Sequence, residues 1–203
     1  CIAACAPKPE AKLVDRMTHD PNSTNTETIL HVWSWNFPTI AENMKTIADA
    51  GFTMLQTSPV NACFSPEGAN IKILDAKEGN WYHYYQPTDW TIGNNILGTE
   101  EEMQVMLDSA KKYNIRVLVD VLPNHTAFDI DLVSDEFYAA VGGREKMFHT
   151  NGLKGIRDDS DRTQCTHQGV GGLPDVNTEN PNFQKYYMEF VNKLIKMGVR
   201  GFR

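Results

Sequence analysis

Hydrophobic and polar positions follow two alternating patterns along the chain from Thr28 onward. Short runs of apolar and β-branched residues, typical of buried strands, alternate with longer stretches in which apolar residues recur every three or four positions, as in helices. The strand-like runs are 28–33, 53–57, 116–121 and 199–202. The helix-like stretches are 38–50, 100–113 and 180–198. This alternation predicts an α/β protein with a parallel sheet covered by helices.

The ends of the predicted helices carry local signals. Gly51 and Gly198 follow the first and last helices, where glycine commonly ends a helix. Thr99 precedes the second helix and Glu102 follows three residues later, which is the pattern of a capping box. The apolar stripes are Ile40, Met44, Ile47 and Ala48, then Met103, Met106, Leu107 and Ala110, then Phe183, Tyr187, Phe190, Val191, Leu194 and Ile195.

Periodicity alone leaves the architecture of the sheet open. An open doubly wound sheet and a closed eight-stranded barrel both give strands that alternate with amphipathic helices. The stretch 126–179 interrupts the alternation, because it is polar, rich in glycine and weakly periodic. It follows the C-terminal end of the third predicted strand, which is where barrel enzymes build their sites and insert extra subdomains.

Composition narrows the class of protein. The 203 residues carry a formal net charge of −7 and suffice for one sizeable domain with a buried core. An acidic chain argues against nucleic acid as a partner, whereas a neutral polysaccharide makes no demand on charge. No apolar run approaches the length of a membrane span.

The first 27 residues have a composition of their own. The chain opens with CIAAC, followed by a stretch rich in Pro, Lys, Asp, Asn and Thr that is typical of a flexible tether. The residues before Cys5 resemble the lipobox of bacterial lipoproteins, which predicts a lipid anchor on Cys5 and an extracellular protein. An ordinary cleaved signal peptide or a cloning remnant is the alternative. The remaining cysteines, Cys63 and Cys165, are expected to be unpaired thiols rather than a disulfide.

Two polar clusters offer oxygen and nitrogen donors. One follows the third predicted strand, and the other lies in the glycine-rich stretch before the last helix. Asn124 and His125 leave the third strand, where an amide oxygen can reach a cation and an imidazole can reach a sugar hydroxyl. Asp175 lies in the run LPDVN, where carboxylate, amide and carbonyl oxygens together suit Ca²⁺. Taken singly, each cluster is better explained as turn or loop residues.

An aromatic cluster follows the second predicted strand. The run NWYHYYQP at 80–87 has four aromatic rings in five consecutive positions. Flat rings can stack on the apolar face of a pyranose, and a hydrophobic plug over a barrel mouth is the alternative interpretation. The chain closes with Gly201-Phe202-Arg203, which has no meaning alone.

The order and spacing of these clusters resemble the alpha-amylase family (glycoside hydrolase family 13), especially bacterial amylases of the subtilis type. The family motif DxxxNH is matched by Asp120, Asn124 and His125, and the motif LPDxN by Leu173 to Asn177. The motif GxRxD is matched through Arg203. The runs LHVWSWNFPTIAENM and TSPVNA add to the likeness, which extends from about Thr28 to Arg203.

The resemblance implies a partial (β/α)₈ TIM barrel. It comprises the first three βα units, an inserted domain B after strand three, and strand four. The implied organisation is a signal or lipobox remnant and tether at 1–27, the first part of the barrel at 28–125, domain B at 126–179, and the barrel again at 180–203.

The resemblance also implies roles for individual residues. The side chains of Asn124 and Asp175 and the carbonyl of Thr166 would bind calcium. His125 would bond the sugar at the cleavage subsite and Tyr85 would stack beneath it. Arg203 would orient a nucleophilic aspartate, and Asp120 would support the site from below. The rest of the implied binding surface consists of Trp81, Tyr82 and Gln86.

The implied activity is endo-hydrolysis of α-1,4 bonds in starch, glycogen and related glucans by a retaining, monomeric, secreted enzyme. The motif's aspartate would stand at position 205, so no residue of this chain is assigned as nucleophile or general acid. We therefore expect the 203 residues alone to be inactive and poorly soluble.

The alternatives are a glucanotransferase or maltogenic enzyme of the same family, or a non-catalytic starch-binding lipoprotein. An open-sheet nucleotide-binding enzyme lacks support, since no glycine-rich phosphate loop follows the first strand.

Overall fold

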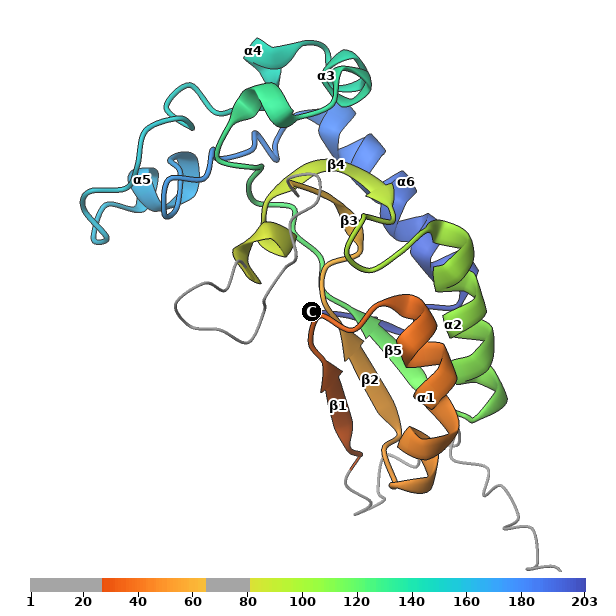
Figure 1. Cartoon of the computed structure of the whole chain (residues 1–203). Helices are drawn as coiled ribbons and strands as arrows, with labels where there is room; N and C mark the ends of the chain where they lie inside the picture. The colour runs from red at the N-terminus through yellow and green to blue at the C-terminus, as the bar shows by residue number, and fades with distance from the viewer. Residues whose placement is uncertain (1–26, 65–80) are drawn as a thin grey trace, which may run out of the picture.

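Four parallel strands form the central sheet of the computed structural model, which describes residues 27–64 and 81–203. The strands are β1 (Ile29–Val32), β2 (Met54–Thr57), β5 (Arg116–Val119) and β6 (Gly201–Phe202), and they lie in the order β1-β2-β5-β6 (Figure 1). Each coincides with a predicted strand. The parallel order follows from the helical crossovers between the strands.

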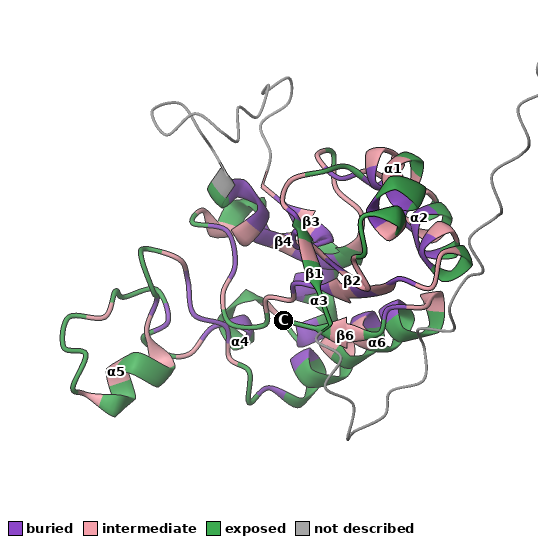
Figure 2. Ribbon diagram, turned by 90° about the horizontal axis from the view of Figure 1, so that it is seen from below, coloured by how far each residue is buried: buried purple, intermediate pink, exposed green. Residues whose placement is uncertain are grey.

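Three long helices lie on one side of this sheet (Figures 1 and 2). They are α1 (Phe37–Asp49), α2 (Glu100–Lys112) and α6 (Pro181–Met197). The capping box of α2 is present in full, as the sequence predicts. The predicted stripe of α2 is entirely buried, and Phe183, Phe190 and Leu194 are buried in α6. Ile195 is the exception: the prediction that it belongs to the apolar stripe is wrong, because 47% of it is exposed.

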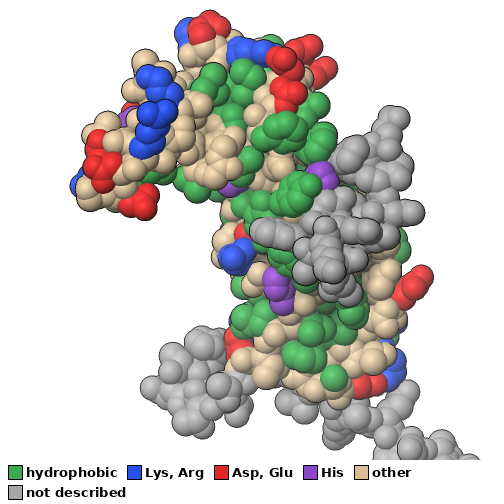
Figure 3. Space-filling model, turned by 60° about the vertical axis from the view of Figure 1, so that its left-hand side comes forward, with side chains coloured by type: hydrophobic (Ala, Val, Ile, Leu, Met, Phe, Trp, Pro, Cys, Tyr) green, Lys and Arg blue, Asp and Glu red, His purple; other side chains and the backbone are tan. Residues whose placement is uncertain are grey.

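The two faces of the sheet differ in burial. Leu55 and Thr57 in β2 and Val117 and Val119 in β5 are buried, whereas the residues that alternate with them are only half-buried. Successive side chains of a strand point to opposite faces, so one face carries the core and the other is less covered. Figure 3 shows hydrophobic side chains over the middle and lower parts of one side of the molecule.

Several short elements were not predicted. After β2, β3 (Asn61–Cys63) pairs antiparallel with β4 (Pro87–Ile92), and the 3₁₀ helix η1 (Trp81–Tyr85) precedes β4. After β5 come the 3₁₀ helix η2 (Ile130–Leu132) and the short helices α3 (Asp135–Val141), α4 (Arg144–Met147) and α5 (Arg162–His167). Figure 2 shows α5 largely exposed and away from the sheet. The proposed division at 126 and 179 stays a prediction.

The cysteine prediction is confirmed for the two cysteines that the structure describes, because Cys63 and Cys165 are both free thiols. The lipobox, Cys5 and the tether lie outside the described residues. Within the described ranges, no helix combines the length and apolar character needed to cross a membrane.

Candidate active site

The C-terminal ends of the sheet strands lie at one edge of the sheet (Figure 1). Three of the predicted site residues meet there. Asp120 follows β5 and Arg203 follows β6. The 3₁₀ helix η1 contributes Tyr85 to the same place, since Tyr85 contacts both residues. Parallel strands present their carboxyl ends together, and barrel enzymes place their sites there.

Asp120 is the centre of a hydrogen-bond network at this edge. Only 3% of the residue is exposed, and its Oδ2 accepts a hydrogen bond of 3.0 Å from the Tyr85 hydroxyl. The same oxygen forms an ion pair with Nη1 of Arg203, which also lies 3.5 Å from the Tyr85 oxygen. Asp120 therefore fixes one side of the Arg203 guanidinium.

Burial and the network both reinforce the ordinary protonation states of Tyr85 and Arg203 at neutral pH. Burial raises the pKa of Tyr85 to about 12, and the neighbouring charge of Asp120 acts in the same direction. The Asp120 carboxylate in turn raises the pKa of the Arg203 guanidinium. Tyr85 therefore stays a neutral hydroxyl donor, and Arg203 stays a cation.

His125 is held beside Tyr85 by the backbone. Its Nε2 lies 2.9 Å from the carbonyl oxygen of Tyr85. A carbonyl only accepts, so Nε2 carries the proton and donates. Burial lowers the pKa of His125, which favours the neutral ring. Its Nδ1 is then an acceptor that can receive a hydrogen bond from a sugar hydroxyl.

Aromatic rings extend the site. Trp33, directly after β1, stacks on Tyr85 with the ring centroids 5.9 Å apart and the planes 27° apart. No motif in the sequence assigns Trp33 to the site, although the run HVWSW at the end of a strand is a signal for it. Tyr82 is exposed, with its ring centroid 4.7 Å from that of His83. Trp81 begins η1, and its side chain lies outside the described residues.

Gln86 has a different position from the one that its predicted role suggests. Its side chain is buried, and its Oε1 accepts a hydrogen bond of 3.2 Å from the Phe128 amide. Gln86 therefore ties the end of η1 to the segment that follows β5. A contact with substrate through Gln86 stays a prediction.

Two of the three predicted calcium ligands lie on adjacent segments. A β-bridge joins His125 to Asp175, and the Asn124 carbonyl accepts a hydrogen bond of 2.9 Å from the Val176 amide. Asp175 is buried, and burial raises its pKa. Its Oδ2 lies 2.6 Å from Nδ1 of His149, a partner that the sequence analysis missed because no local motif marks it.

The third predicted ligand, Thr166, is on α5. Its hydroxyl donates to the Arg162 carbonyl, and its own carbonyl belongs to the last helical turn, where carbonyls lack intrahelical partners. The next residue, His167, has its ring centroid 4.4 Å from that of His149, which brings this end of α5 toward Asp175. Carboxylate, amide and carbonyl oxygens are the donors that Ca²⁺ prefers, so the three residues fit that ion by their chemistry.

The site can bind a polar ring compound by stacking and hydrogen bonds. Its two buried carboxylates are not free to attack a substrate, since Asp120 is held by Arg203 and Tyr85, and Asp175 by His149. The geometry at this edge therefore indicates binding and positioning rather than covalent chemistry by these two groups.

Comparisons with known proteins identify a single family. The family model described as "Alpha amylase, catalytic domain" matches residues 22–203. An alpha-amylase of Butyrivibrio fibrisolvens is 43% identical over 195 residues, which cover 96% of this chain and 20% of that protein. The chain thus spans about a fifth of the length of this curated relative.

Solved structures agree at the level of the fold. Alpha-amylase I from Eisenia fetida superposes with a TM-score of 0.71 at 22% identity, covering 87% of this chain and 37% of that one. An alpha-amylase from Geobacillus thermoleovorans, complexed with acarbose, gives a TM-score of 0.68 at 22% identity, with 87% and 39% covered. The sheet and its helices are therefore part of a TIM barrel, as predicted.

Proposed function

The chain belongs to the alpha-amylase family, and from that membership we propose that the intact protein is a glycoside hydrolase that cuts α-1,4 bonds of starch-like glucans with retention of configuration. The observation that carries the proposal is the contact of Tyr85, Asp120 and Arg203 at the C-terminal ends of the strands, next to His125. In a barrel, this edge is where catalytic groups collect.

Each residue of the site has a task in this proposal. The Tyr85 ring, supported by Trp33, offers an apolar face for a glucose unit. His125 accepts a hydrogen bond from a sugar hydroxyl through Nδ1, while its Nε2 is held by the Tyr85 carbonyl. Arg203, kept charged and oriented by Asp120, positions a carboxylate that attacks the anomeric carbon.

The retaining reaction requires two carboxyl groups about 5–5.5 Å apart, one as nucleophile and one as acid. Among the buried carboxylates described at this edge, Asp120 and Asp175 are both engaged and supply neither role. We therefore propose that the 203 residues alone do not hydrolyse glucans. The acarbose complex of the Geobacillus thermoleovorans amylase supports a glucan-like ligand for this architecture.

Calcium is part of the proposal. The Asn124 and Asp175 side chains and the Thr166 carbonyl would hold the ion. Bound there, Ca²⁺ would supply positive charge beside the buried Asp175 carboxylate and would tie α5 to the loop after β5. The β-bridge between His125 and Asp175 joins the proposed calcium site to the proposed sugar site, so the chain itself holds the two sites next to each other.

A matched pair of arginine substitutions tests the site. The intact protein is incubated with amylose, and the anomeric configuration of the first products is followed by NMR; α-products are expected. Arg203→Lys should lower kcat at least about tenfold, since lysine does not reproduce the geometry of a guanidinium. Arg144→Lys, on α4, changes an exposed ion pair with Asp131 of η2 and should leave kcat unchanged.

Two outcomes would count against the hydrolase. β-configured products would contradict retention, and an absence of turnover by the intact protein would favour the starch-binding alternative. Cyclic or transferred oligosaccharides as main products would identify a glucanotransferase instead. The lipid anchor on Cys5 and the extracellular location are separate proposals, which mass spectrometry of the N-terminal peptide tests directly.

A further inference from the structure

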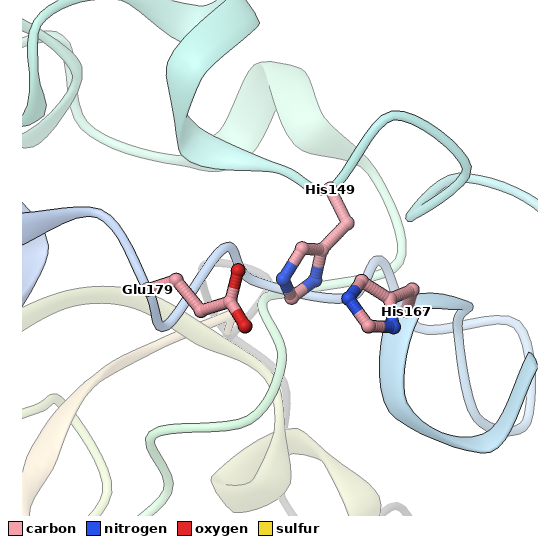
Figure 4. Close-up of side chains that lie close together, drawn as sticks. All are labelled: His149, His167 and Glu179. Atoms are coloured by element: carbon pink, nitrogen blue, oxygen red, sulfur yellow. The ribbon is translucent and has the colours of Figure 1, made fainter. Parts of the chain in front are cut away.

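Three side chains of types that commonly bind metals lie close together outside the proposed sugar site. His149 follows α4, His167 ends α5, and Glu179 lies just before α6. One donor atom from each lies within 4.8 Å of the other two. Figure 4 shows the His149 ring between the Glu179 carboxylate and the His167 ring. Three segments that are separate in sequence thus present two imidazoles and one carboxylate to each other.

His149 is oriented as a metal ligand would be. Its Nδ1 lies 2.6 Å from the Asp175 carboxylate, and 10% of its side chain is exposed. When Nδ1 bonds to Asp175, Nε2 is the ring nitrogen that is left to bind a metal. That nitrogen is buried and has no hydrogen-bond partner among the described residues. Metal-bound histidines characteristically give their other ring nitrogen to a carboxylate, which fixes the ring and raises its basicity.

The cluster opens onto a cleft of about 660 Å³. His149, His167 and Glu179 line this cleft together with Asn177, whose Oδ1 is also buried without a partner in the described part of the chain. Buried polar atoms are normally hydrogen-bonded. Two such atoms at one cleft leave polar groups that a ligand entering it can bond.

We propose that His149, His167 and Glu179 bind a Zn²⁺ ion, with a water molecule in the fourth position. Two imidazoles and a carboxylate with one open position are a known ligand set for zinc. Imidazole nitrogen suits borderline metals such as Zn²⁺, whereas Ca²⁺ takes oxygen donors. The site is therefore distinct in chemistry from the calcium ligands, and it does not depend on the proposed hydrolase activity.

Only two of the three side chains would have to move for all three to reach the ion. Bonds of about 2.0–2.2 Å in a tetrahedron place ligand atoms roughly 3.3–3.6 Å apart, and the donor atoms here lie within 4.8 Å of one another. His149 is fixed by Asp175, but His167 is half-buried at the end of a short helix and Glu179 is exposed. Rotation of these two side chains onto the ion would connect α5 and the start of α6 through His149.

Zinc titration of the intact protein tests the proposal. The protein is stripped of metal, given millimolar Ca²⁺ to fill the oxygen ligands, and titrated with Zn²⁺ while bound metal is measured after dialysis. One equivalent should bind, and Co²⁺ in its place should give the absorption bands of a four-coordinate site. His167→Gln and Glu179→Gln should each weaken zinc binding by more than about tenfold.

Two controls separate this site from unspecific binding. Glu145→Gln removes an exposed carboxylate that lines the same cleft and should bind zinc like the wild type. Asn124→Ala removes a proposed calcium ligand and should also retain the zinc equivalent. Unchanged zinc affinity in both the His167 and Glu179 variants, or an equal loss in Glu145→Gln, would overturn the proposal. Melting temperatures without zinc verify that each variant is folded.

Discussion

One buried carboxylate, Asp120, determines the arrangement of the proposed sugar site at the scale of single residues. It receives both the Tyr85 hydroxyl and the Arg203 guanidinium, which come from segments far apart in the chain. A buried anion is stable only when it is paired and hydrogen-bonded, so these three side chains are interdependent. Removal of the charge should therefore affect stability as well as binding.

Asp120→Asn should lower the free energy of unfolding by roughly 1.5–3 kcal/mol, the range for hydrogen bonds to charged groups. The amide keeps the shape but leaves Arg203 without its counter-charge. Urea unfolding of the intact protein measures the loss. Asp131→Asn breaks the exposed ion pair with Arg144 and is the matched control, with little change expected. Equal midpoints for the two variants would show that the network does not stabilise the fold.

His83 provides a prediction for pH dependence. It is buried in η1, and burial lowers its pKa from the ordinary value of 6.5. Above pH 6.5 the ring is neutral in both the folded and the unfolded protein. As the pH falls below 6.5, the unfolded chain takes up a proton that the folded protein still excludes, so stability decreases. Replacement by leucine removes this contribution.

The free energy of unfolding of His83→Leu, measured in urea between pH 7 and pH 5, should therefore fall less steeply than that of the wild type. Other titrating groups are common to both proteins and cancel in the difference. Parallel curves would mean that His83 does not resist protonation in the folded state.

Residues in short motifs were predictable, and residues defined by distant contacts were not. Asn124, His125 and Asp175 belong to local patterns, and the structure places them on adjacent segments. His149 acquires its importance from Asp175, 26 residues away, which no local pattern reveals.

At the scale of elements, the long helices were predictable because their signals are local. The capping box of α2 involves the Thr99 hydroxyl, which accepts from the Glu102 amide, and the Glu102 carboxylate, which accepts from the Thr99 amide. Both hydrogen bonds join residues three positions apart, so the sequence alone defines them.

Thr99→Ala should cost about 1 kcal/mol of the free energy of unfolding, because the amide of Glu102 loses its partner at the start of α2. Chemical denaturation of the intact protein gives the value. The same substitution at Thr46, an exposed position inside α1, serves as the control and should not destabilise, since alanine favours helix. Equal effects at the two positions would show that the cap contributes nothing.

The short elements were missed because tertiary packing stabilises them. Helix α3 has seven residues, too few for a clear periodic pattern. Its Phe137 is buried against Trp90 of β4, with the ring centroids 4.7 Å apart, and against Phe183 of α6. The three aromatic residues lie in separate stretches of sequence, and only folding brings them together.

For the whole molecule, periodicity predicted strands and helices but left the closure of the sheet undecided. Periodicity does not tell which side of the sheet each helix covers, whereas an open doubly wound sheet has helices on both faces and a barrel has them only outside. Here the alternate residues of β2 and β5, such as Gln56 and Arg116, are only half-buried. That less covered face is the barrel interior in the solved amylases, which is why the family motifs resolved what periodicity could not.

Calcium should stabilise the intact protein by linking α5 to the loop after β5. A ligand that binds only the folded state contributes about 2.7 kcal/mol when its concentration is 100 times Kd. Chelation should therefore lower the melting temperature by several degrees. Calorimetry with and without EDTA measures the shift.

Metal add-back distinguishes the two proposed sites within this one experiment. Ca²⁺ returned to the chelated protein should restore most of the lost stability in the wild type and in His167→Gln, but not in Asn124→Ala. Zn²⁺ returned alone should raise the melting temperature of the wild type and of Asn124→Ala, but not that of His167→Gln. This crossed pattern follows from the donors, because Asn124 offers only an amide oxygen and His167 only imidazole nitrogen. A melting temperature that does not respond to EDTA would contradict both sites, and one metal rescuing both variants equally would mean that the two sets of ligands do not act separately.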